Sequence, residues 1–126
     1  MKDRNSHLEI YQEIDFLLDV QPWSGHITAC ESLSMGVPII TMSGDNHAGR
    51  MVASILHCLG RHEWIAQTVD DYAKCVCAAV DTWHSSQRKH LRKQFLKSSI
   101  CNGLQYTQNF EKNIQNILKK NSSPLP

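Results

Sequence analysis

The chain has 126 residues, with 13 basic and 12 acidic side chains and a formal charge of +1. This length suits one domain with a real core, but it is small for a complete two-lobed enzyme. The near-neutral balance argues against a general binder of nucleic acids or of membrane surfaces, and no apolar run approaches the 18 residues of a membrane span.

Two strand–loop–helix units in succession are predicted in the first half of the chain, and helices dominate the second half. Apolar residues at helical spacing alternate with short apolar runs, and Gly or Pro separates them. In the first half we expect a helix at 6–13, a buried strand at 15–19, a loop at 21–25, a helix at 26–35 ended by Gly36, a strand at 37–42 and a loop at 43–46. A helix from about 48 then ends at Gly60, and a third, very short strand follows at 64–66. The remaining elements are a helix that follows the Thr68 capping box and runs to Trp83, and helices at 87–96 and 103–118.

This order of elements predicts an α/β fold with a small parallel sheet. Neighbouring parallel strands are joined by right-handed crossovers, and a parallel sheet is usually covered on both faces. Two firm strands and one short one amount to half of a doubly wound, Rossmann-like domain. At least one strand edge should then be exposed or paired with something else, which would permit self-association.

The loop and helix after the first strand form the first candidate site. Ser24, Gly25, His26 and Thr28 lie where a helix amino terminus offers free N–H groups to phosphate. Glu31 lies one turn beyond Thr28 on the same face, where a carboxylate can accept both hydroxyls of a ribose. An alternative needs no ligand, because Thr28-x-x-Glu31 also matches a capping box.

The loop after the second strand is similar in kind. His47 and Arg50 open a helix at the carboxyl end of a strand, where a substrate or a diphosphate could be bound. In the alternative, Asp45 or Asn46 caps the helix and Arg50 pairs with an acid such as Asp19 or Asp45.

The remaining reactive and charged residues have simpler interpretations. The basic run 87–97 is most simply the solvated face of an amphipathic helix, so no nucleic-acid partner is expected. Trp83 is expected to pack in the core or between helices. The five cysteines suit small core residues and reduced thiols, and without CxxC spacing no metal site is predicted. The polar amino terminus lacks a secretory signal, which favours a cytoplasmic location.

Several motifs in order resemble the O-GlcNAc transferase and SPINDLY family of inverting GT-B glycosyltransferases. They are an IDxxLD-like strand, the loop and helix SGHITACE, SMGVP, GDNHAGR and the ending LGRHEWIA. The carboxyl-terminal SSICNGLQYTQNFEKNIQNIL also looks like the end of that family. The resemblance implies that residues 4–118 are the second half of the carboxyl-terminal, UDP-sugar-binding lobe and that 119–126 are a flexible tail.

The same resemblance implies roles for individual residues. His26 and Thr28, with the backbone at Ile27, would meet the diphosphate, and Glu31 would hold the ribose. His7, in the start Arg4-x-x-His7-Leu-x-x-Tyr, matches a histidine near the uracil and ribose, and Arg4 matches a basic residue there. The chain departs from the family at three positions: Ile27 replaces a threonine, Ser24 an asparagine and Ser34 a tryptophan.

The implied function is the donor-binding portion of a protein O-GlcNAc-transferase-like enzyme. The expected donor is a UDP-sugar such as UDP-GlcNAc, and a protein Ser or Thr would be the acceptor in the intact enzyme, without a cofactor. The acceptor site, the candidate catalytic base and a phosphate-binding lysine belong to parts of the family that this sequence does not contain. No catalytic residue is therefore assigned, and the chain alone is expected to be inactive. The alternative is a non-catalytic module that binds a nucleotide or a protein.

Overall fold

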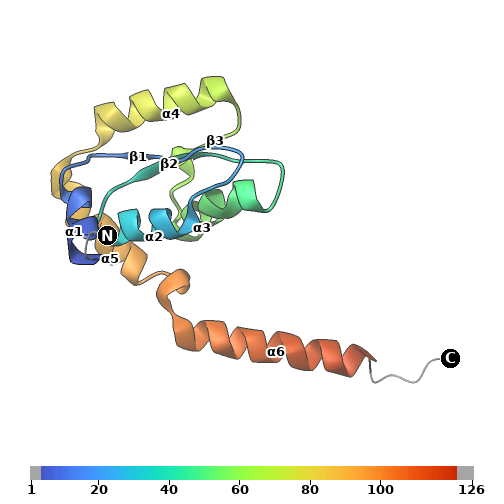
Figure 1. Cartoon of the computed structure of the whole chain (residues 1–126). Helices are drawn as coiled ribbons and strands as arrows, with labels where there is room; N and C mark the ends of the chain where they lie inside the picture. The colour runs from blue at the N-terminus through green and yellow to red at the C-terminus, as the bar shows by residue number, and fades with distance from the viewer. Residues whose placement is uncertain (1–3, 122–126) are drawn as a thin grey trace.

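A small parallel sheet lies between one helix on one face and two helices on the other (Figure 1). The computed structural model describes residues 4–121. The strands are β1 (Leu17–Leu18), β2 (Ile39–Met42) and β3 (Ile65–Ala66). The helices are α1 (Arg4–Glu9), α2 (His26–Ser34), α3 (Met51–Leu59), α4 (Val69–Thr82), α5 (Arg88–Leu96) and α6 (Gly103–Asn121), with short 3-10 turns η1 (Ile10–Gln12), η2 (Ala48–Arg50), η3 (His62–Trp64), η4 (Ser85–Gln87) and η5 (Ser99–Cys101).

The sheet has the order β1-β2-β3, and both strand pairs are parallel. Helices α2 and α3, which connect successive strands, lie on the same face of the sheet, as two right-handed crossovers in the same direction require (Figure 1). Helix α4 covers the other face. The predicted α/β class, the small parallel sheet and the short third strand are confirmed. Within residues 4–121, β1 and β3 are the edge strands.

Glycines end two helices as predicted. Gly36 and Gly60 have φ angles of 75° and 68°, in the left-handed region that favours glycine after a helix. Thr68 caps α4 by accepting a hydrogen bond from the Asp71 amide at 3.1 Å. The last helix extends to Asn121 and not to 118, so residues 119–121 of the predicted tail are helical. Residues 122–126 lie outside the described part of the chain.

The hydrophobic core contains side chains of the central strand and of helices α2, α3 and α5. Its fully buried members include Leu33 of α2, Leu56 of α3 and Leu91 of α5, which meet Ile39 and Ile40 of the central strand. Each of these helices presents one apolar stripe to the sheet, and burial of such a stripe supplies most of the stability of a short helix.

The cysteines only partly follow the prediction that they are core residues. Cys30 and Cys75 are half-buried, but Cys58, Cys77 and Cys101 are exposed. The prediction was wrong for these three because the helix carrying Cys58 and the one carrying Cys77 each bury one face only, and η5 lies at the surface. All five are free thiols.

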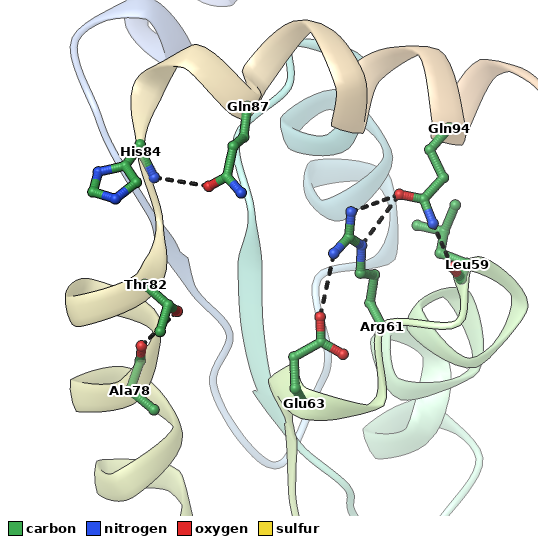
Figure 2. A network of polar contacts seen from close by, with 8 residues as sticks. All are labelled: Leu59, Arg61, Glu63, Ala78, Thr82, His84, Gln87 and Gln94. Atoms are coloured by element: carbon green, nitrogen blue, oxygen red, sulfur yellow. Dashed lines mark hydrogen bonds and ion pairs between the residues drawn. The ribbon is translucent and has the colours of Figure 1, made fainter.

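An arginine-centred network fastens the end of α3 to α5 (Figure 2). Arg61 donates two hydrogen bonds to Gln94 Oε1, at 3.2 Å and 2.7 Å, and a third to Glu63 at 3.3 Å. Gln94 Nε2 in turn donates to the Leu59 carbonyl at 2.7 Å, satisfying an oxygen that the helix end leaves free. The guanidinium also lies 5.0 Å from the ring centroid of Trp64. The last helix before α6 is thereby held against the body.

The basic helix α5 is amphipathic, as predicted. Leu91 and Phe95 are buried, whereas Lys89, Arg92 and Lys93 are exposed. Trp83 packs edge-on against Trp64 with ring centroids 5.9 Å apart, which confirms its packing role.

Candidate functional site

The candidate site lies beyond the carboxyl ends of β1 and β2, where the two predicted loops meet. The Ser24 amide of the first loop donates to the Ala48 carbonyl of the second at 3.2 Å. Between the loops is an open hollow of about 270 Å³, lined in part by Trp23, His26 and His47. Two histidines that the sequence placed in separate loops therefore share one surface.

Asp19 at the end of β1 organises the first loop. Its carboxylate accepts hydrogen bonds from Ser24 Oγ at 2.6 Å, Thr41 Oγ1 at 2.7 Å and the Gly25 amide at 2.9 Å. Its backbone carbonyl accepts from the Tyr72 hydroxyl at 2.9 Å, which connects the loop to α4. Charge-assisted hydrogen bonds of this kind are the strong ones, so Asp19 holds the start of α2 in one position.

Ser24 supports this arrangement from inside the protein. Its side chain is fully buried. While donating to Asp19, its hydroxyl also accepts from the Val52 amide at 3.2 Å. Ser24 thus joins β1, the loop and α3, and its burial corrects the expectation that its hydroxyl could reach a phosphate. Its neighbour Gly25 is the N-cap residue of α2.

The amino terminus of α2 is open to solvent and has no side-chain cap. His26, Ile27 and Thr28 form its first turn, where N–H groups have no carbonyl ahead of them in the helix. Thr28 is the third residue of the helix, so the capping-box alternative for Thr28 and Glu31 is wrong. Ile27 and Thr28 are exposed and His26 is half-buried. The geometry suits an anion that approaches along the helix axis.

Glu31 on α2 contacts two side chains from the amino-terminal segment. One carboxylate oxygen, Oε2, lies 3.3 Å from His7 Nε2 and accepts a hydrogen bond from the Tyr11 hydroxyl at 3.2 Å. Burial and the nearby carboxylate raise the pKa of Tyr11 to about 12, so the hydroxyl remains a donor over the ordinary pH range. Glu31 itself is half-buried and His7 is exposed, which leaves part of the pair accessible to a ligand. Arg4 begins α1, but its side chain is outside the described part.

The second loop, residues 43–50, is held by hydrogen bonds between its own residues. Asn46 Oδ1 accepts from the Gly49 amide at 2.7 Å, and Arg50 Nη1 donates to the carbonyl of Asp45. The ligand-free alternative was wrong in both parts: the N-cap residues of η2 and α3 are His47 and Arg50, neither with a side-chain cap, and Arg50 pairs with a carbonyl rather than with a carboxylate. Arg50 and His47 are both exposed, and His47 lines the hollow shared with α2.

Three residues that carry the site were not assigned to it from the sequence. Asp19 was named only as a possible partner of Arg50, and Tyr11 was assigned no role. Gln21 supports the second loop by donating to the carbonyls of Met42 at 2.6 Å and Gly49 at 3.2 Å. Asp19 had a usable signal, because an acid directly after a buried strand lies at the carboxyl edge of the sheet.

Neither a metal cluster nor a membrane helix is found in residues 4–121. No three His, Cys, Asp or Glu side chains in that range are grouped so that they could hold a metal ion. None of the helices there has the length and apolar character needed to cross a bilayer.

Comparison with known proteins places the whole region in one family. Residues 2–110 match the model of glycosyl transferase family 41. A probable UDP-N-acetylglucosamine–peptide N-acetylglucosaminyltransferase SPINDLY from Petunia hybrida is 36% identical over 118 residues, covering 92% of this chain and 13% of the relative. The corresponding protein from Eustoma exaltatum is 39% identical over 109 residues, covering 85% and 12%.

A solved structure agrees with the sequence comparison. An O-GlcNAc transferase mutant from Thermobaculum terrenum superimposes with a TM-score of 0.64 at 32% identity. The match covers 75% of this chain and 18% of that one. The chain thus spans only a small part of the length of its relatives.

Proposed function

The chain belongs to glycosyl transferase family 41, and we propose that it supplies the ribose and diphosphate contacts of a UDP-sugar site. The observation that carries the proposal is the meeting of His7 and Glu31 beside the open end of α2. These two residues are 24 positions apart in sequence, and His7 Nε2 lies 3.3 Å from Glu31 Oε2 in the fold. Relatives named as UDP-N-acetylglucosamine–peptide transferases make UDP-GlcNAc the expected donor and a protein the acceptor.

The diphosphate would lie at the amino terminus of α2. The amides of Ile27 and Thr28, the Thr28 hydroxyl and the His26 ring are the donors there, and the helix dipole favours the negative charge. During transfer of the sugar to a Ser or Thr hydroxyl, these donors would stabilise the charge that UDP gains as the leaving group. Ile27 offers only its backbone, because it carries no hydroxyl. His47 and Arg50 are placed to approach the same phosphates from the second loop.

The ribose would lie against Glu31. A carboxylate with one oxygen oriented by Tyr11 can accept both ribose hydroxyls, and His7 would extend the contact towards the uracil. Arg4 is proposed for the same end of the ligand from its sequence motif alone. Residues 4–118 would together form part of the carboxyl-terminal lobe of a GT-B enzyme.

Replacing Glu31 is expected to weaken nucleotide binding. Hydrogen bonds to a charged group contribute about 1.5–3 kcal/mol, so Glu31→Ala should raise the Kd for UDP by about 10- to 100-fold. Isothermal titration calorimetry with UDP and with uridine measures the effect. Glu31→Gln keeps an acceptor for Tyr11 and separates loss of charge from loss of packing. Glu63→Gln, which changes an exposed glutamate paired with Arg61, is the matched control.

The two ligands also separate the two halves of the site. Thr28→Val should weaken the binding of UDP more than that of uridine, because only UDP has a diphosphate. Glu31→Ala should weaken the binding of both ligands. If folded wild-type chain binds UDP without saturation, or if Glu31→Gln and Glu63→Gln bind it equally, the donor-site proposal is wrong. A non-catalytic protein-interaction module, which the exposed apolar side chains along β1 favour, would then be the better interpretation.

Transfer activity is expected to be absent from this chain alone. The acceptor site and the catalytic base of the family lie outside the regions that it resembles. Incubation with radiolabelled UDP-GlcNAc and an acceptor peptide should yield neither labelled peptide nor UDP above the rate without protein. Sustained turnover by the purified chain would contradict this expectation.

A further inference from the structure

Arg88 differs from the exposed basic residues of helix α5, because its side chain is bound by another part of the chain. Only 20% of this side chain is exposed. Its guanidinium donates to the backbone carbonyl of Tyr11 at 2.9 Å and to that of Ile14, and it lies 3.7 Å from the Asp15 carboxylate. The two carbonyls lie 77 and 74 positions earlier in the chain, in the segment that follows α1 (Figure 1). Arg88 thus fastens the amino-terminal segment to α5.

The backbone of Arg88 also approaches the turn that ends α2. A Cβ atom at Gly36 would collide with the Arg88 carbonyl oxygen, so the two segments are in close contact there. Arg88 therefore touches both segments that meet at the ribose end of the proposed site, namely α2 with Glu31 and the amino-terminal segment with Tyr11. An arginine suits this place because its planar guanidinium can donate to two acceptors at once, whereas the ammonium of lysine is a single point charge.

Tyr11 connects this anchor to the carboxylate of Glu31. Tyr11 is 4% exposed, its backbone carbonyl is held by Arg88, and its hydroxyl donates to Glu31 Oε2 at 3.2 Å. His7 Nε2 lies 3.3 Å from the same oxygen. Within residues 7–120, no hydrogen bond is made to the other oxygen, Oε1. The protein therefore orients the carboxylate through one oxygen and leaves the other for a ligand.

We propose that Arg88 is a positioning residue for recognition of the ribose hydroxyls, and that it acts through Tyr11 on Glu31. Oε1 of Glu31 would accept the 2′ and 3′ hydroxyls, while Arg88 keeps Tyr11 at the distance that fixes Oε2. The site would then prefer a ribonucleotide to its 2′,3′-dideoxy analogue, and this preference would depend on a residue of α5 that does not touch the ligand. The inference rests on the proposed nucleotide function and deepens it.

The ratio of the Kd for 2′,3′-dideoxy-UDP to the Kd for UDP isolates the ribose contact. Isothermal titration calorimetry with the full chain should give a wild-type ratio of about 10 or more, because the analogue lacks the hydrogen bonds to a charged group. Arg88→Lys cannot donate to both carbonyls in the same way and should lower this ratio at least about threefold. Arg92→Lys, at an exposed arginine of the same helix, is the matched control and should change the ratio less than about 1.5-fold.

Two further variants separate positioning from a general loss of structure. Gly60→Ala strains the fold at a site where an added Cβ meets nothing within 4 Å, and it should leave the ratio unchanged. Tyr11→Phe keeps the ring and the backbone carbonyl but removes the hydroxyl, so it should lower the ratio as Arg88→Lys does. Combining Tyr11→Phe with Arg88→Lys should lower the ratio little further, because both act through one chain of contacts. Thermal unfolding by circular dichroism confirms that each variant is folded.

The possible failures are distinguishable. If wild type prefers UDP but Arg88→Lys keeps the full ratio, the positioning role is wrong and the nucleotide site stands. If Arg88→Lys does not fold, an unchanged ratio in Tyr11→Phe overturns the inference instead. A ratio near 1 for wild type would overturn the ribose contact and this inference but not the diphosphate site. Absence of UDP binding by wild type would overturn the nucleotide site as well.

Discussion

Asp19→Ala should lower the free energy of unfolding by about 3–5 kcal/mol, because two buried hydroxyls and one amide lose a charged hydrogen-bond acceptor. Its carboxylate is the acceptor for Ser24, Thr41 and the Gly25 amide. The side chains of Ser24 and Thr41 are fully buried, so their hydroxyls would lose an acceptor that water cannot easily replace. The same change should release the start of α2 and abolish UDP binding by the fraction that still folds.

Urea unfolding followed by circular dichroism measures this loss. Asp19→Asn keeps one carbonyl acceptor and should lose roughly half as much stability. Asp45→Ala is the matched control, because Asp45 is an exposed aspartate in the neighbouring loop. Arg50 donates to the backbone carbonyl of Asp45, which alanine retains. The control should change stability by less than about 0.5 kcal/mol. A loss below about 1 kcal/mol for Asp19→Ala would show that the network does not hold the loop.

Gly36→Ala should destabilise the fold by about 3 kcal/mol or more, through strain and collision together. Gly36 has a φ of 75°, which costs an L-residue about 1–2 kcal/mol. An added Cβ would also lie only 2.4 Å from the Arg88 carbonyl oxygen. That carbonyl belongs to backbone that cannot move easily, because the Arg88 side chain donates to the carbonyls of Tyr11 and Ile14.

Gly60→Ala separates the two contributions. Gly60 has a similar φ of 68°, but nothing lies within 4 Å of its added Cβ. Gly60→Ala should therefore cost only the conformational strain, about 1–2 kcal/mol. Equal losses for the two glycines in the same unfolding experiment would show that the approach of α5 to Gly36 is not tight.

Local patterns were sufficient to predict the helices and strands. Gly36 and Gly60 marked two helix ends because few other residues tolerate the left-handed conformation after a helix. The period of apolar residues identified the helices that cover the sheet, and short apolar runs identified the strands. Boundaries were less certain where apolar periodicity and hydrogen bonding end at different residues, as at the end of α6.

The partners of individual polar side chains could not be predicted in the same way. Spacing allowed Thr28 and Glu31 to be either a cap or a ligand site, and only the position of the helix start excluded the cap. Ser24 was grouped with the phosphate site because its local sequence gives no sign that it is buried. Its hydroxyl is covered by α3, which is more than 20 residues away in the chain. His7 and Tyr11 reach Glu31 across a similar distance in sequence.

The sequence by itself determined the α/β class, the order of the elements and the family resemblance. These properties depend on residue type and local spacing, which the chain carries in any conformation. The tertiary structure alone decided that Asp19 organises the loop and that Glu31 meets His7. Such contacts arise only when the sheet brings distant segments together, because hydrogen bonds and packing act over a few ångströms in space and not along the chain.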